Sequence, residues 1–263
     1  MEDRYREILI SPLKECVNYL PKFGHNNSKG FSLEDFQVLY GSDVFYKWLG
    51  LNSPLMYSAH KLAGGITSIY RQIGIGCERL VREIFLDYLK LSPEAVRWSY
   101  VIDSVNGRKR TLYLDGRIEF DAVQDDRKKF KLLKWKESVL SNLKLSESVC
   151  KMIKGVVFEV RQGYKSKDSK RQNADIANAT NAYLNGYIPC LMLMSSQIDD
   201  AILLRYSQSK WLILQGYVNI SSVTSTYDFF RDIIGFDLAS FMDNNQVYFK
   251  DEVNRILKLL SES

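Results

Sequence analysis

Three charged residues lie on segments whose positions alternate in the way that β-strands do. In residues 117–123 the apolar side chains share one face and Asp121 lies on the other; in residues 156–162 Glu159 and Arg161 share the polar face. A carboxylate on a central strand is costly to bury unless it is paired or binds a metal. Two neighbouring strands would therefore bring Asp121 and Glu159 together at a functional point.

Two carboxylates at one point are typical ligands of a hard divalent cation such as Mg²⁺, which keeps several waters. Such an ion activates water and stabilises charge on a phosphoryl oxygen. Arg161 would support the attacking water or the charged transition state, although a guanidinium stays protonated and cannot act as a base. Lys165 shares the strand parity and is the alternative for this role if the strand continues past Gly163. The competing interpretation of Glu159 and Arg161 is a surface ion pair on an edge strand.

A third acidic residue, Glu78, lies at the start of a helix expected over residues 78–91, just after Gly74-Ile75-Gly76. It falls on the apolar stripe of that helix, three residues before Val81. An acidic side chain directed at the core indicates a functional role. The alternative is a carboxylate that satisfies backbone amides at the helix start.

A basic segment follows the second of these strands and runs into the next expected helix, which opens on a capping-box pattern. Its cations would bind phosphates, and its amide side chains would pair with adenine edges. The DNA-binding candidates are Lys165, Lys167, Lys170, Arg171, Gln172 and Asn173. The alternative is a solvated loop followed by a helix cap. A further basic run, residues 127–136, is the second place where phosphates would bind.

The elements that must position these residues follow from periodicity and turn residues. Helical spacing predominates before residue 92, and the pattern then changes to strands near 98–105 and 110–123, with a hairpin turn at Asn106-Gly107. Later segments alternate between strand and helix, and the chain closes with helices. This order predicts an α/β (α+β) fold with a mixed central β-sheet flanked by helices.

Composition excludes several other classes of protein. The chain has 263 residues, a net charge of +5 and only two histidines, and its four cysteines are scattered, so no zinc site is expected. There is no phosphate-binding G-x-x-x-x-G-K-[ST] loop. No apolar run is long enough to span a membrane and the amino terminus has no apolar leader, so we expect no membrane partner and a cytoplasmic protein.

The pattern resembles the PD-(D/E)xK nuclease superfamily. The matching residues are Gly74-x-x-x-Glu78 on a helix, Asp121 on a strand and Glu159-x-Arg161 on the next strand. The stretch from Glu159 to Asn178 is similar to type II restriction endonucleases in particular, and the whole resemblance covers about residues 71–195. Phe120 replaces the usual proline before Asp121, an arginine replaces the usual lysine, and the spacing from Asp121 to Glu159 is longer than is common.

The resemblance implies a restriction-endonuclease-like fold and Mg²⁺-dependent cleavage of double-stranded DNA at a short specific sequence. Glu78, Asp121 and Glu159 would hold the metal, and a homodimer would cut both strands of a symmetric site. The expected regions are a helical part over 1–70 for dimerisation or DNA contact, a catalytic core over 71–220 and closing helices over 221–263. The alternatives are a resolvase or repair nuclease of the same superfamily, and a noncatalytic DNA-binding protein with a decayed site.

Overall fold

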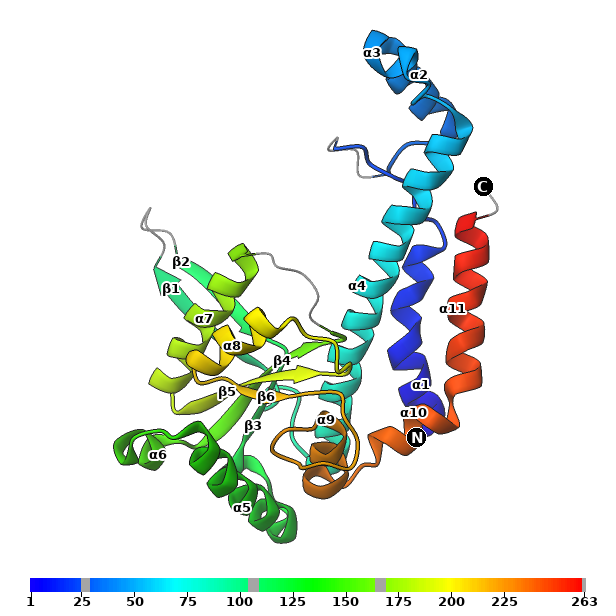
Figure 1. Cartoon of the computed structure of the whole chain (residues 1–263). Coiled ribbons are helices and arrows are strands. Elements are labelled where there is room, and N and C mark those ends of the chain that lie inside the picture. The colour runs from blue at the N-terminus through cyan, green and yellow to red at the C-terminus, as the bar shows by residue number, and fades with distance from the viewer. Residues whose placement is uncertain (25–28, 104–108, 164–168, 262–263) are drawn as a thin grey trace. The chain divides into compact units, whose positions relative to one another are not determined.

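The structure, a computed structural model, describes residues 1–24, 29–103, 109–163 and 169–261. The chain divides into two units, each of which packs mainly on itself. The first comprises residues 1–76 and 244–263, and the second comprises residues 77–243. Figure 1 shows the helices and strands of both units.

A mixed four-stranded sheet forms the centre of the second unit, in the order β3-β4-β5-β6. The strands are β3 (Gly116–Glu119), β4 (Gly155–Arg161), β5 (Tyr187–Leu193) and β6 (Leu212–Leu214). β3 runs antiparallel to β4, whereas β4, β5 and β6 are parallel. A mixed central sheet was predicted from the sequence and is confirmed.

Helices cover both faces of this sheet, as predicted (Figure 1). On one face lies the last part of α4 (Pro54–Leu89), from residue 77 onward, whose Phe85 ring is centred 5.1 Å from that of Phe158 on β4. On the other face, α7 (Ser169–Leu184) and α8 (Asp200–Gln208) bury Ala179 and Tyr206 against β5. Because both faces are covered, the parallel strands are almost continuously apolar.

A separate hairpin lies beside the sheet and consists of β1 (Trp98–Asp103) and β2 (Lys109–Leu114). Trp98 and Leu114 pack with Val157 of β4 and Tyr187 of β5, so the base of the hairpin is fixed to the α7 side of the sheet. The predicted turn at residues 106–107 lies outside the described residues.

The remaining elements of the second unit are helical, and α5 is the longest of those named here. They are η2 (Phe120–Ala122), α5 (Asp126–Leu143), α6 (Glu147–Met152), α9 (Thr226–Asp228), the π-helical η3 (Phe229–Ile234) and most of α10 (Leu238–Asn244). Asp125 caps α5 by accepting hydrogen bonds from two backbone amides, and Lys144 ends the helix in a left-handed conformation.

The first unit contains α1 (Glu2–Ile10), η1 (Ser11–Cys16), α2 (Leu33–Ser42), α3 (Val44–Trp48), the first part of α4, and α11 (Gln246–Ser261). Its core joins α1, η1, α4 and α11 through Ile10, Leu13, Ile69 and Ile256. Helices α1, α4 and α11 run side by side in Figure 1.

The prediction that a helix begins at residue 78 is wrong, because α4 is continuous from residue 54 to residue 89 and contains four glycines. The glycines allow other segments of the first unit to approach the helix. A Cβ atom at Gly76 would lie 2.1 Å from the backbone oxygen of Leu9, and one at Gly64 would lie 1.9 Å from the hydroxyl of Tyr19. Among the described residues, no helix is both long and apolar enough to cross a membrane.

Candidate active site

The pairing of β3 with β4 brings Asp115, the residue before β3, to the position beside Glu159. Gly116 pairs with Phe158, so the register extended by one residue sets Asp115 opposite Glu159. Two hydrogen bonds fix this arrangement: the Asp115 amide donates to the Phe158 carbonyl at 2.8 Å, and the Val160 amide donates to Asp115 Oδ2 at 2.8 Å. Asp115 therefore holds the position that the sequence pattern assigned to Asp121.

The structure does not bring Asp121 to Glu159. Strand β3 ends at Glu119, and Asp121 lies in the 3₁₀ turn η2. Its side chain is 85% exposed and forms a 2.7 Å ion pair with Lys129, which lowers the pKa of the carboxyl group. The antiparallel register explains the discrepancy, because Glu119 pairs with Gly155, at the opposite end of β4 from Glu159.

Glu159 and Arg161 lie on the same side of β4, as their alternation predicts. Arg161 Nη2 is 2.6 Å from Glu159 Oε1, and the two side chains are only 9% and 13% exposed. This ion pair is therefore buried on an internal strand rather than exposed on an edge strand. A buried pair carries a large desolvation cost and is weak evidence for stability by itself.

Asp175 completes this network and was missed by the sequence analysis. It lies on α7, is 4% exposed, and its Oδ2 atom is 3.2 Å from Arg161 Nη2. The hydroxyl of Tyr206 on α8 donates a hydrogen bond to the same oxygen. A signal existed in the sequence, because Asp175 shares one helical stripe with the buried Asn178, Ala179 and Ala182.

Glu78 belongs to the same electrostatic environment. Its pKa is raised to about 7, mainly by burial and also by the negative charge of Asp115, whereas Arg82, Arg161 and Arg79 act in the opposite direction. The predicted inward orientation of this carboxylate therefore agrees with its surroundings. A group with a pKa near 7 can gain or lose a proton close to neutral pH.

The pKa values of Glu159 and Asp115 are also raised. Burial and the charge of Asp115 raise the pKa of Glu159 well above its usual value, against the effect of Arg161. Burial also raises the pKa of Asp115, against the Val160 hydrogen bond and the charges of Arg161 and Arg82. Glu78, Asp115, Glu159 and Asp175 thus form one group of acidic side chains around Arg161, and we call it the carboxylate cluster.

Arg82 joins the carboxylate cluster to the surface beside β3. It lies one turn after Glu78 on α4, and its Nε atom donates to the backbone oxygen of Asp115 at 3.1 Å. One guanidinium group therefore interacts with the backbone of one acidic residue and lowers the pKa values of two.

The predicted DNA-binding segment is described only in part. Lys165 and Lys167 lie outside the described residues. Lys170, Arg171, Gln172 and Asn173 lie in the first turns of α7, which begins at Ser169 as the capping pattern predicts. The side chains of these four residues are outside the described part of the chain.

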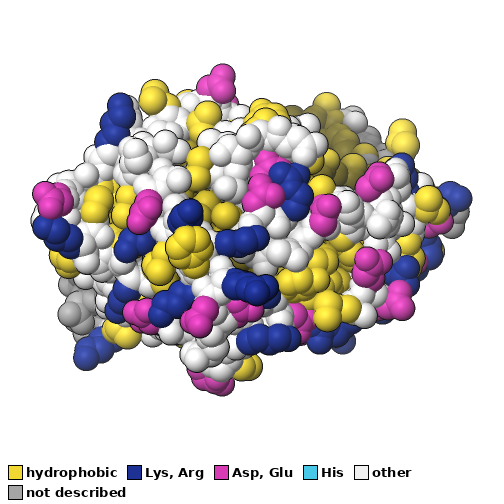
Figure 2. Space-filling view, turned by 90° about the horizontal axis from the view of Figure 1, so that it is seen from below, with side chains coloured by type: hydrophobic (Ala, Val, Ile, Leu, Met, Phe, Trp, Pro, Cys, Tyr) yellow, Lys and Arg dark blue, Asp and Glu magenta, His cyan; other side chains and the backbone are white. Residues whose placement is uncertain are grey.

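The basic run over residues 127–136 lies on α5, and several of its lysines have partners within the protein. Lys131 Nζ donates to the Asp232 carbonyl at 3.2 Å, Lys136 Nζ donates to the Ile153 carbonyl at 3.0 Å, and Lys128 donates to the Tyr88 carbonyl. Figure 2 views the molecule from the side on which α5 lies in Figure 1, and its Lys and Arg side chains are interspersed with acidic and hydrophobic ones. Much of this basic run therefore stabilises the packing of α5.

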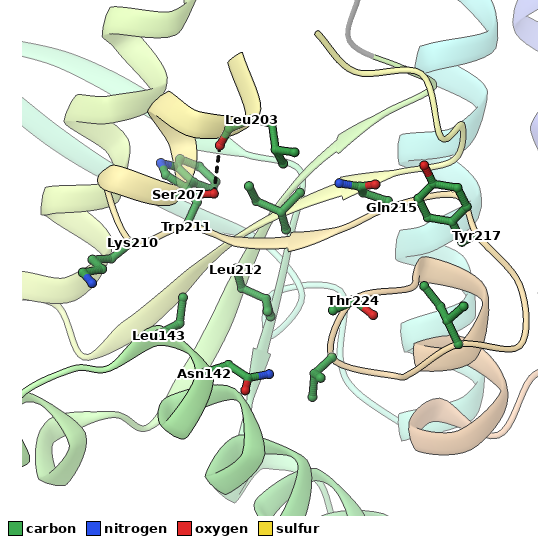
Figure 3. Close-up of a pocket in the computed structure, with 13 residues that line it drawn as sticks. Asn142, Leu143, Leu203, Ser207, Lys210, Trp211, Leu212, Gln215, Tyr217 and Thr224 are labelled. Atoms are coloured by element: carbon green, nitrogen blue, oxygen red, sulfur yellow. Dashed lines mark hydrogen bonds between the residues drawn. The ribbon is translucent and has the colours of Figure 1, made fainter. Parts of the chain in front are cut away.

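Two concave regions of the second unit differ in character. A cavity of about 450 Å³ is lined by the end of α5, by α8 and by the segment around β6 (Figure 3). Apart from Lys210, its lining is apolar or uncharged, and no member of the carboxylate cluster reaches it. A groove of about 750 Å³ beside β3 includes Asp115 and Arg82 in its lining.

The donor set of the cluster suits a hard cation, because Asp115, Glu159 and Glu78 offer only carboxylate oxygens. A divalent cation bound to these side chains would stabilise their ionised form, which burial disfavours. Among the described residues, however, no group of three or more His, Cys, Asp or Glu side chains is arranged to hold a metal ion. A pair of carboxylates with water as the remaining ligands is the arrangement that these residues can provide.

Comparisons with known proteins add no family assignment, since no protein-family model, curated protein or solved structure matches this chain.

Proposed function

We propose that this protein hydrolyses phosphodiester bonds of double-stranded DNA in a Mg²⁺-dependent reaction, with Asp115 in the role first assigned to Asp121. The observation that carries the proposal is the position of Asp115 beside Glu159, fixed by the Val160 amide, with Glu78 in the same charge environment. A helix acid, a strand acid and Glu-x-Arg on the neighbouring strand resemble the PD-(D/E)xK arrangement more closely with Asp115 than with Asp121.

Asp115 and Glu159 would hold the cation. When bound, Mg²⁺ supplies Lewis-acid activation of water and stabilises charge on the phosphoryl oxygen. Glu78 is the proton-accepting group of the proposal, because its pKa of about 7 lets it take a proton from the attacking water near neutral pH.

Arg161 supplies positive charge at the reacting phosphate. Its guanidinium group is oriented by Glu159 on β4 and by Asp175 on α7. Since it stays protonated, it stabilises developing negative charge and takes no proton. Lys165 remains the alternative source of this charge.

The finer form of the proposal is a type II restriction endonuclease that acts as a homodimer. It rests on the resemblance of the stretch from Glu159 to Asn178, and on Gln172 and Asn173 in the first turns of α7, where amide side chains are suited to base edges. A two-fold dimer would supply one active site for each strand.

One observation favours a second candidate, a DNA-binding protein without catalysis. Arg161 already occupies Glu159 Oε1 at 2.6 Å, so the cation would have to compete with a guanidinium group for this carboxylate. The two candidates agree on DNA binding and differ only in cleavage.

Incubation of the purified protein with supercoiled plasmid DNA tests the proposal. We expect nicked and linear products with Mg²⁺ and none with a chelator. Glu159→Gln should abolish the products while it retains binding to duplex DNA in Ca²⁺. An intact plasmid at high enzyme concentration, with binding retained, would favour the noncatalytic candidate, and full cleavage by Glu159→Gln would overturn the site assignment.

A further inference from the structure

The groove beside β3 lies next to the carboxylate cluster and has its own chemistry. It measures about 750 Å³, and its walls come from α4, from the segment before β1, from the β2–β3 junction and from the starts of β4 and β5. Asp115 lines one part of it, so the groove adjoins the proposed active site at this residue. We call it the β3 groove.

Positive charge predominates in the β3 groove. Its lining includes four basic residues and two acidic ones, which are Arg82, Arg97, Arg117, Lys154, Glu94 and Asp115. This excess of cations differs from the carboxylate cluster, where acids predominate. A basic groove leading to an acidic reaction centre is suited to a polyanion whose backbone passes the centre.

Two of the basic residues are held in place by the backbone. Arg117 Nε donates to the Ala95 carbonyl at 2.8 Å, and its Nη2 atom donates to the Glu94 carbonyl at 3.2 Å. Arg82 is fixed through the Asp115 carbonyl. A guanidinium group has five N–H donors, so each arginine retains donors for a phosphate after these bonds.

The other two basic residues are exposed at the groove. Arg97 lies on the segment before β1, and Lys154 precedes β4, with its ammonium group 5.0 Å from the centre of the Tyr187 ring. Because their side chains are exposed, both can be replaced without opening the core.

Aromatic side chains contribute to the same surface. Trp98 and Tyr187 are 6% and 4% exposed and form firm walls. Tyr113, by contrast, is 69% exposed on β2. An exposed aromatic ring beside a row of cations offers a sugar or base a surface on which to pack.

We propose that the β3 groove binds the phosphodiester backbone of a DNA duplex and leads one strand to Asp115. Arg97 and Lys154 contact phosphates, Arg82 and Arg117 provide fixed charge along the floor, and Tyr113 packs on the nucleotide. The inference rests on the proposed function and adds a substrate-binding surface that lies outside the predicted segment 165–173. It distinguishes this groove from α5, whose lysines largely bind protein carbonyls.

Binding to a fluorescent DNA duplex over a salt series, in Ca²⁺ without Mg²⁺, tests the proposal. The double variant Arg97→Ala/Lys154→Ala should bind about tenfold more weakly than the wild type at ~0.1 M salt, and its salt slope should fall by about two units. The matched control is Lys151→Ala/Arg255→Ala, which removes the same net charge from two exposed ion pairs outside the groove. This control should keep the wild-type salt slope.

Tyr113→Ala provides a second, independent readout. It should weaken binding by about fivefold to tenfold at every salt concentration without a change in slope, because it removes packing rather than charge. A duplex RNA of the same sequence forms the second arm, and it should bind more weakly than the DNA.

The outcomes separate this inference from the proposed function. If the Arg97→Ala/Lys154→Ala variant binds like its matched control, the β3 groove is not the DNA-binding surface, whether or not the protein cuts plasmid. If RNA binds in preference to DNA, the inferred DNA ligand is wrong. If the predicted losses appear but the wild type never cuts DNA with Mg²⁺, the inference stands and the hydrolase proposal fails.

Discussion

The two aspartates that flank β3 lie only six positions apart in the sequence, yet their environments are opposite. Asp115 lies just before the strand and accepts a hydrogen bond from the Val160 amide, and its pKa is raised because it is buried. Asp121 lies beyond its end, is 85% exposed and has a lowered pKa because of Lys129. The same residue type is therefore a candidate metal ligand at one end of the strand and a surface group at the other.

The difference arises from the register of the strand pair rather than from the local sequence. In an antiparallel pair, the residue that reaches the end of the partner strand comes from the beginning of β3. Only the start of β3 adjoins Glu159 and Arg161, so of these two aspartates Asp115 is the one that can share a cation with Glu159.

The largest effect is expected when each aspartate is neutralised in turn and its effect on cleavage is measured. Asp115→Asn should reduce Mg²⁺-dependent plasmid cleavage on the order of 100-fold or more, because it removes a ligand charge. Asp121→Asn should cut at the wild-type rate, since its side chain contacts solvent and Lys129. Single-turnover cleavage rates measure both. A dead Asp121→Asn with an active Asp115→Asn would restore the assignment made from the sequence.

The next largest effect is expected for stability at Asp175. Asp175→Ala removes one of two carboxylates from the buried Arg161 and also the acceptor of the Tyr206 hydroxyl, so it should cost about 3 kcal/mol of unfolding free energy. Asp175→Asn keeps the volume and an acceptor oxygen, and it should cost less. Urea denaturation in metal-free buffer provides the measurement. Equal stability of Asp175→Ala and wild type would show that Glu159 alone compensates Arg161.

Much of the framework was predictable because local signals agreed with tertiary structure. The later alternation of strand and helix patterns predicted β4 and β5 as strands, and the capping pattern predicted the start of α7 at Ser169. The alternation of Glu159 and Arg161 also predicted their shared side of β4. In each case the pattern lies within one element and depends little on its neighbours.

The acids of the candidate site depended on contacts that no local pattern encodes. Ile118 and Phe120 are both buried, so the alternation continues in burial even though the strand ends at Glu119. Asp115 precedes a glycine and was not among the predicted site residues, because its hydrogen bond with the Val160 amide connects two strands. Asp175 shares its buried stripe with alanines, whose small side chains made the stripe inconspicuous.

The raised pKa of Glu78 predicts how the stability of the protein depends on pH. Glu78 has a folded pKa of about 7, above its usual value of 4.5, so the folded state binds more protons than the unfolded state between these values. Its stabilising contribution is therefore present below about pH 4.5 and is lost as the pH rises through about 7. Between pH 5 and pH 8 the wild type should therefore lose about 1–2 kcal/mol more unfolding free energy than Glu78→Gln does, after allowance for solvent screening.

Denaturation of the wild type and Glu78→Gln at both pH values, without divalent ions, measures this difference. Glu83→Gln is a control on the same helix. A wild type that gains stability relative to Glu78→Gln as the pH rises would reverse the sign and contradict the inferred environment of Glu78.

A divalent cation should act on one aspartate and not on the other. At pH 8, Ca²⁺ or Mg²⁺ in excess should raise the melting temperature of the wild type by a few degrees, because binding to the folded state stabilises it. Asp115→Asn should lose this response, and Asp121→Asn should keep it. If all three proteins respond equally, the cation binds outside the carboxylate cluster.

The smallest effect is expected at the solvent-exposed ion pair of Asp121 and Lys129. Lys129→Ala removes the partner of Asp121, and carboxyl carbon NMR should then show the pKa of Asp121 rising toward its usual value, because the hydrogen bond and charge of Lys129 keep it low. The melting temperature should not change measurably, since exposed ion pairs contribute little to stability. In the same titration the Asp115 carbon should still titrate above its usual range, because burial rather than Lys129 determines its pKa. A shift of Asp115 together with Asp121 would mean that the two ends of β3 are electrostatically coupled, and the separation drawn between them would have to be abandoned.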